Sequence, residues 1–72
     1  MVNTKALRML MIEKEVGIAG IAEAIGRSYS TASMKINGKR DMTFGEAEKI
    51  QALLGIHDED FAYYFMSHER SA

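Results

Sequence analysis

Three of the six glycines, Gly26, Gly38 and Gly55, divide this chain of 72 residues into segments that are each long enough for one or two short helices. Between them, apolar residues recur every three or four positions, the spacing of an amphipathic helix. Gly26, Gly38 and Gly55 each follow such a segment, and glycine readily adopts the left-handed conformation that ends a helix. The sequence therefore favours a bundle of short helices. It lacks the alternation of apolar and polar residues that strands require.

The periodicity predicts an all-α domain of five helices. We expect them over Thr4 to Glu15, Ile18 to Ile25, Tyr29 to Asn37, Thr43 to Leu54 and Asp58 to Met66. On the fourth helix we expect the following residues to face inward: Ala47, Ile50, Leu53 and Leu54. The whole chain, residues 1–72, reads as one domain with a core over about residues 4–66 and a frayed tail at 67–72.

Capping residues mark where these helices begin. Asn3 or Thr4 suits the start of the first helix, and Ser28 suits the start of the third. Thr43-Phe44-Gly45-Glu46 matches a capping box, in which the first and fourth side chains each bond to the other's backbone N–H. We expect Asp58 to cap the fifth helix.

Several function classes find no support in the sequence. The absence of cysteine excludes disulfides, thiolate zinc sites and cysteine nucleophiles. We identify neither a phosphate-binding glycine loop nor a nucleophile with its base, and therefore expect no enzyme, no cofactor and no small-molecule substrate. The spacing of His57 and His68 fits no metal-binding pattern. No apolar run approaches a membrane span, and we expect a cytoplasmic protein.

Charge is unevenly distributed along the chain. The formal net charge is only −1. Residues 24–45 nevertheless carry four cations and one acid, whereas the chain from Gly55 onward carries four acids and one cation. Salt screening limits the reach of each charge to roughly 8 Å at physiological salt. The local balance of charges therefore matters more than the net charge of the whole chain. The sequence predicts one basic region and one acidic end.

The most informative segment runs from Ile18 to Arg40 and reads IAGIAEAIGRSYSTASMKINGKR. Two helices of about eight residues are joined there by Gly26-Arg27-Ser28. A turn this short makes two helices cross steeply, as in a helix-turn-helix. Ala22 supplies the small residue needed at the crossing, and Gly26 reverses the chain.

With the following TFGEAEKI, this segment resembles the Cro/CI-type helix-turn-helix domains of phage repressors and related bacterial regulators. The resemblance extends over roughly Leu7 to Leu54. It implies a compact five-helix domain of the lambda-repressor type, whose third helix enters the major groove of DNA. Four positions depart from the family pattern. Ile18 stands where many members have a polar phosphate-binding residue, and Ala32 where many have a larger apolar one. Arg27 is charged where an aliphatic residue is common, and Lys35 stands where many members bury an apolar residue, a role that we expect Ile36 to take.

The resemblance also implies a set of DNA-contacting residues. The outward positions that face base edges would be Tyr29, Ser30, Ser33 and Met34. Contacts with the DNA backbone would come from Asn37, Lys39 and Arg40, and we include Arg27, Ser28 and Lys35 beside them. Serine discriminates poorly between bases, and the first half of this helix lacks a side chain that reads guanine or adenine bidentately.

The implied function is a sequence-specific regulator of transcription, a prophage-type repressor or Cro-like protein that occupies an operator on double-stranded DNA in the nucleoid.

Four aromatic residues between positions 61 and 65 cannot all point inward from one helix, so at least one is expected at the surface. We therefore expect a homodimer, which would suit half-sites about 34 Å apart.

A second interpretation stays open at this point. The near-neutral charge and the aromatic, acidic C-terminal segment also suit a protein-interaction module on the same scaffold, such as an antitoxin or antirepressor.

Overall fold

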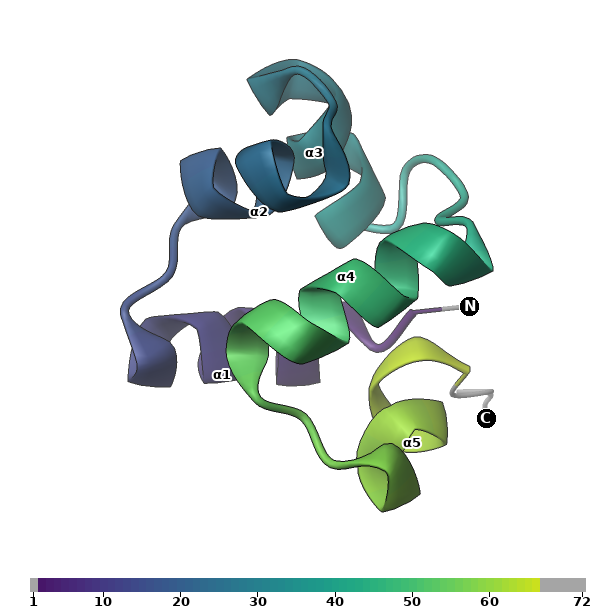
Figure 1. Cartoon of the computed structure of the whole chain (residues 1–72). Coiled ribbons are helices and arrows are strands. Elements are labelled where there is room, and N and C mark those ends of the chain that lie inside the picture. The colour runs from purple at the N-terminus through teal and green to yellow at the C-terminus, as the bar shows by residue number, and fades with distance from the viewer. Residues whose placement is uncertain (1, 67–72) are drawn as a thin grey trace.

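The computed structural model describes residues 2–66, in which five α-helices and one short 3-10 helix form an all-α domain without strands (Figure 1). The helices are α1 (Thr4–Lys14), α2 (Ile18–Ile25), α3 (Tyr29–Ile36), α4 (Phe44–Leu54) and α5 (Phe61–Phe65). In the view of Figure 1, α4 crosses the middle, with α2 and α3 above it and α1 and α5 below. None of the helices in this part of the chain is long and apolar enough to cross a membrane.

Local capping explains where the first three helices begin. The Asn3 side chain accepts a hydrogen bond from the Ala6 N–H at 3.2 Å, and Gly17 precedes α2 in an extended conformation. Ser28 Oγ accepts from the Thr31 N–H at 3.1 Å and starts α3. These three positions confirm the predicted starts.

The turn between α2 and α3 depends on Gly26. Its φ is +70°, in the left-handed region, and its N–H continues the helical hydrogen bonding to the Glu23 carbonyl at 3.3 Å. The N–H of Arg27 donates to the Ala22 carbonyl at 3.1 Å, which closes the end of α2. The predicted turn Gly26-Arg27-Ser28 is therefore confirmed.

The C-terminal region differs from the predicted single helix. Residues Asp58–Asp60 form a 3-10 helix, and α5 begins only at Phe61. Asp58 does not cap α5, because it lies within the 3-10 helix and Asp60 is the residue before α5; the Asp58 carboxylate instead accepts a hydrogen bond from Gln51 Nε2 at 2.7 Å. The same nitrogen donates to the Ile56 carbonyl at 3.1 Å, so α4 itself shapes the connection to α5. The tail at residues 67–72 lies outside the described residues.

The core is apolar and draws on all five α-helices. Its buried members are Leu7, Met11, Ile21, Ala22, Ile25, Ala32, Ile36, Ala47, Ile50, Leu54, Ile56 and Phe65. The prediction for Leu53 was wrong, since this residue is 41% exposed. Leu53 lies about 100° around the helix from Leu54, which points into the core. The N–H of Asn3 donates to the Tyr64 carbonyl at 2.8 Å and fastens the N-terminal segment to α5.

Candidate nucleic-acid interface

The first half of α3 presents a polar face. Tyr29 is 62% exposed, Ser30 is also exposed, and Ser33 and Met34 are half-buried. Ala32 and Ile36 of the same helix are fully buried and hold it against the core. Of the four outward positions expected from the sequence, two are exposed and two are partly covered.

Two cations are fixed beside the C-terminal end of α3. The N–H groups of Lys39 and Arg40 both donate to the Met34 carbonyl, at 2.8 and 3.3 Å. Gly38, with a φ of +76°, makes this reversal possible. Both cationic residues are exposed, and their backbone is held in a defined position relative to α3.

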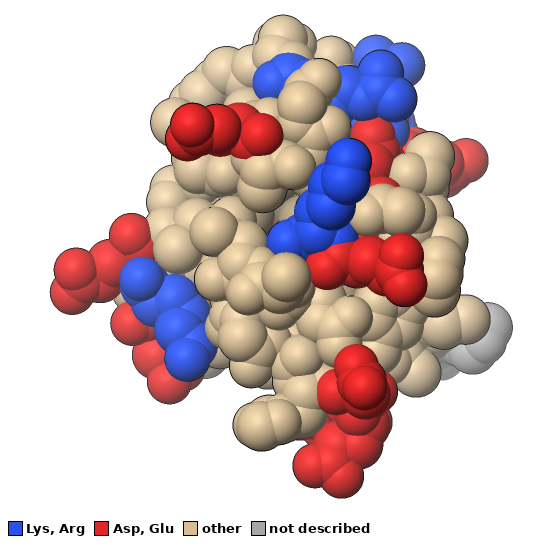
Figure 2. Space-filling view, in the orientation of Figure 1, with Lys and Arg blue, Asp and Glu red and all other residues tan. Residues whose placement is uncertain are grey.

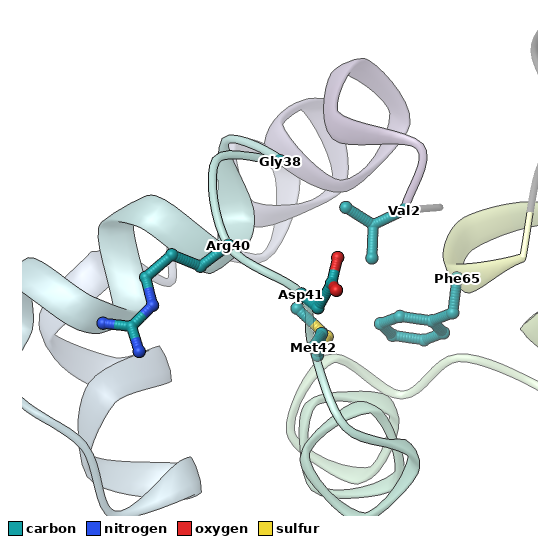
Figure 3. A pocket seen from close by; sticks show the side chains of 6 residues that line it. All are labelled: Val2, Gly38, Arg40, Asp41, Met42 and Phe65. Carbon is teal, nitrogen blue, oxygen red and sulfur yellow. The ribbon is translucent and has the colours of Figure 1, made fainter.

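Figure 3 shows how Arg40 lies beside a hollow of about 430 Å³ between the N-terminal segment, the loop after α3 and α5. The Asp41 side chain extends toward Val2, whereas the Arg40 guanidinium extends away from Val2, Met42 and Phe65. The guanidinium of Arg40 therefore points out of this hollow, and only the part of the residue near its backbone borders it (Figure 3).

Lys35 requires a correction, because it was expected among the DNA-contacting residues and is only 5% exposed. Its Nζ donates to Glu46 Oε1 at 2.9 Å and to the Asp41 carbonyl at 2.8 Å. A buried ammonium needs such partners to offset its lost hydration. Lys35 thus links α3 to the loop and to α4. Its ammonium group is paired inside the protein and is not exposed for a contact with DNA.

Glu46 receives hydrogen bonds from three elements. Its Oε1 also accepts from the Thr43 N–H at 2.9 Å, and its Oε2 accepts from Arg27 Nε at 3.0 Å. Burial raises the pKa of the Glu46 carboxyl, but the hydrogen bonds from Thr43, Lys35 and Arg27 and the charge of Lys35 together lower it to about 2. The carboxylate is therefore ionised at neutral pH. The predicted capping box is present as one part of this network.

Arg27 and Ser28 are both partly engaged in the fold. The Arg27 side chain is 53% exposed and uses its Nε for Glu46, which leaves its terminal nitrogens at the surface. The Ser28 hydroxyl caps α3 and also donates to Thr31 Oγ1 at 3.1 Å. Ser28 thus has a clear structural role at the start of α3.

Sequence reasoning missed Arg8, which lies on α1 and is exposed. Its Nη1 donates to Asn37 Oδ1, and Asn37 Nδ2 donates to Ser33 Oγ at 3.4 Å. Arg8, Tyr29, Ser33 and Asn37 line one groove of about 380 Å³, together with apolar side chains from α1 and α2. Because Arg8 and Asn37 are 29 positions apart, no local pattern could have placed them together.

The charge is mixed on the side of the molecule that carries α4 (Figure 2). Figure 2 views the molecule from the side of α4 and shows blue and red atoms interspersed, with a red group at the lower edge where Figure 1 places the start of α5. This view contains no uniformly basic face. Around α3, the exposed cations are Arg8, Arg27, Lys39 and Arg40.

Residues 2–66 contain no cluster of three or more His, Asp or Glu side chains arranged to hold a metal ion. His68, the second histidine considered above, lies outside the described residues.

No protein-family model matches the chain, and searches of curated proteins and of solved structures give no significant match.

Proposed function

We propose that this protein is a sequence-specific DNA-binding regulator that places α3 in the major groove of double-stranded DNA. The observation that carries the proposal is the accessible polar face of Tyr29 and Ser30, with Lys39 and Arg40 fixed beside the same helix through the Met34 carbonyl. An α-helix fits the major groove, and neighbouring cations are suited to phosphates.

The proposed mode of action is occupancy of an operator, as in a prophage-type repressor or a Cro-like protein. This role would place the protein in the cytoplasm, on the nucleoid. A homodimer formed through the α5 region would bring two copies of α3 to half-sites one helical turn apart. The exposed side chains of Tyr63 and Met66 support this part of the proposal.

Selection of bound sequences from a random duplex pool tests the proposal most directly. A palindromic consensus would support both sequence reading and dimerisation, and a consensus without symmetry would support reading by a monomer. Failure to bind any duplex at about 50 mM salt would end the proposal, since phosphate contacts are strongest under these conditions.

Charge reversal then tests the placement of the interface. Lys39→Glu and Arg40→Glu should each weaken duplex binding roughly tenfold at about 0.1 M salt and make the salt dependence shallower. Lys14→Glu is the matched control, because Lys14 lies on α1 and lines a separate hollow with Gly55 and His57. Equal losses in all three variants would contradict an interface at α3.

A protein-interaction module, such as an antitoxin or antirepressor, is the second candidate. It is favoured by the exposed aromatic surface around α5, where Phe44 and Phe61 pack with ring centroids 5.4 Å apart and Tyr63 stays exposed. This candidate predicts that duplex binding is weak and unselective, and that Lys39→Glu changes it no more than Lys14→Glu does.

A further inference from the structure

Arg8 lies outside the helix-turn-helix segment but reaches its surface. It belongs to α1, and its guanidinium meets Asn37 at the end of α3. The groove that it lines also includes Tyr29 and Ser33, which belong to the proposed reading face. A DNA strand that follows α3 would therefore pass close to Arg8.

The guanidinium of Arg8 keeps most of its hydrogen-bonding capacity. It has five N–H donors, of which the hydrogen bond to Asn37 Oδ1 uses one. Both salt bridges among residues 2–66 involve Glu46, and neither involves Arg8. The positions three and four residues away on α1 are also free of acids: Thr4, Lys5, Met11 and Ile12.

Asn37 is held in one orientation. Its Nδ2 faces Ser33 Oγ, so its Oδ1 is directed to Arg8. An acceptor fixed in this way limits where the long Arg8 side chain can lie, without neutralising its charge. A preorganised side chain loses less conformational entropy when it binds a ligand.

We propose that Arg8 binds a backbone phosphate of the duplex whose bases face α3, and that Asn37 is the residue that positions it. The inference deepens the proposed function and rests on it. Arg8 would then extend the interface from α3 to α1 and fix the register of the domain on DNA, because a guanidinium offers two parallel donors to a phosphate.

The test uses the full chain and the duplex obtained by selection, with the dissociation constant measured by fluorescence anisotropy at several salt concentrations. Arg8→Ala should weaken binding about eightfold at 0.1 M salt and lower the magnitude of the salt slope by about 0.9, the values expected for one lost phosphate contact. Lys14→Ala removes the same charge from the same helix and should leave both values near the wild type. Arg8→Lys should keep the slope but not the full affinity.

The Asn37→Ala variant distinguishes the positioning of Arg8 by Asn37 from the effect of the Arg8 charge itself. It should keep the wild-type salt slope, since Arg8 is intact, and weaken binding about threefold through the freed Arg8 side chain. In the Arg8→Ala background, the Asn37→Ala change should weaken binding less than it does in the wild type, because the part of its effect that acts through Arg8 is gone. The thermal unfolding temperature of each variant is expected to stay near that of the wild type, because Arg8 is exposed and Asn37 only half-buried, and its measurement excludes misfolding as the cause.

The outcomes are distinguishable. If the wild type binds no duplex, the proposed function fails and this inference fails with it. If the wild type binds and Arg8→Ala behaves like Lys14→Ala in affinity and slope, the inference alone is overturned.

Discussion

The two sides of α4 are held by different kinds of interaction. Toward α3, a buried carboxylate, Glu46, joins the α2–α3 turn, α3 and the start of α4 through directional hydrogen bonds. Toward α5, Gln51 bonds only to the connecting segment, and the contact between the two helices is aromatic: the rings of Phe44 and Phe61 lie with centroids 5.4 Å apart. Directional bonds fix an orientation, whereas apolar contacts contribute burial and tolerate small shifts.

This difference matches what each side would have to do in the proposed regulator. A helix that reads base edges must be held in one orientation, and the Glu46 network holds α3 in that way. A surface for self-association needs exposed apolar area, and the α5 side provides it through Tyr63, Met66 and Phe44.

The largest loss of stability on the α3 side is expected at Glu46. Glu46→Ala should lower the free energy of unfolding by about 3–5 kcal/mol, because it leaves the buried ammonium of Lys35 without its carboxylate. Urea unfolding measures this effect. Glu48→Ala, an exposed change on the same helix, should remain within about 0.5 kcal/mol of the wild type.

A double variant shows whether the lost pairing is the cause. Lys35→Met combined with Glu46→Gln removes both charges and keeps an acceptor for the Thr43 N–H. It should be more stable than Glu46→Ala by at least about 1 kcal/mol. Equal stability of Glu46→Ala and Glu48→Ala would show that the network does not hold α3.

Acid should weaken the α3 side through protonation of Glu46. The pKa of Glu46 is lowered from 4.5 to about 2 in the folded protein, so that its contribution to stability is complete above pH 4.5 and is lost as the pH falls toward 2. The difference in pKa corresponds to about 3 kcal/mol.

Urea unfolding of the wild type and of Glu46→Gln between pH 2 and pH 7 isolates this contribution. The wild type should lose about 3 kcal/mol more than the variant between pH 4.5 and pH 2. If the free energies of unfolding of the wild type and of Glu46→Gln fell in parallel over this pH range, Glu46 would not be the cause of the loss of stability in acid.

Gly26 tests the turn that supports α3, with a smaller effect. A Cβ at this position would meet no atom within 4 Å, so Gly26→Ala is resisted only by its φ of +70°. The expected loss of stability is about 1–2 kcal/mol. Gly45→Ala is the control, because Gly45 is equally open but lies in α4, where alanine should add about 0.5–1 kcal/mol. Losses of equal size at both positions would show that the turn conformation is not what matters.

The features predicted correctly from the sequence are local ones. Gly26, Ser28 and the Thr43–Glu46 capping box act within a few residues of their own position, and the structure confirms each of them. The same holds for the bounds of α2, which agree with the prediction. Local hydrogen bonding and backbone preferences are sufficient to place these features.

The features that were missed depend on contacts between distant segments. Lys35 was expected at the surface because it is charged, although it lies three residues after the buried Ala32 and next to Ile36. That spacing was a signal that Lys35 faces inward, but its partner Glu46 could be identified only from the packing of α4 against α3. Likewise, only the tertiary structure brings Arg8 beside Asn37.

The smallest expected effect on stability, and the sharpest test of the α5 side, comes from Tyr63. Tyr63→Ser should change the free energy of unfolding of the monomer by no more than about 0.5 kcal/mol, because the ring is mostly exposed. If this surface forms the dimer, the change should weaken self-association roughly tenfold in sedimentation equilibrium, since exposed tyrosines often dominate such interfaces. Leu53→Ser removes an exposed apolar side chain from the C-terminal end of α4 and should leave association unchanged. Association that responds to Leu53→Ser and not to Tyr63→Ser would move the contact surface away from α5, and with it the expected spacing of the two copies of α3.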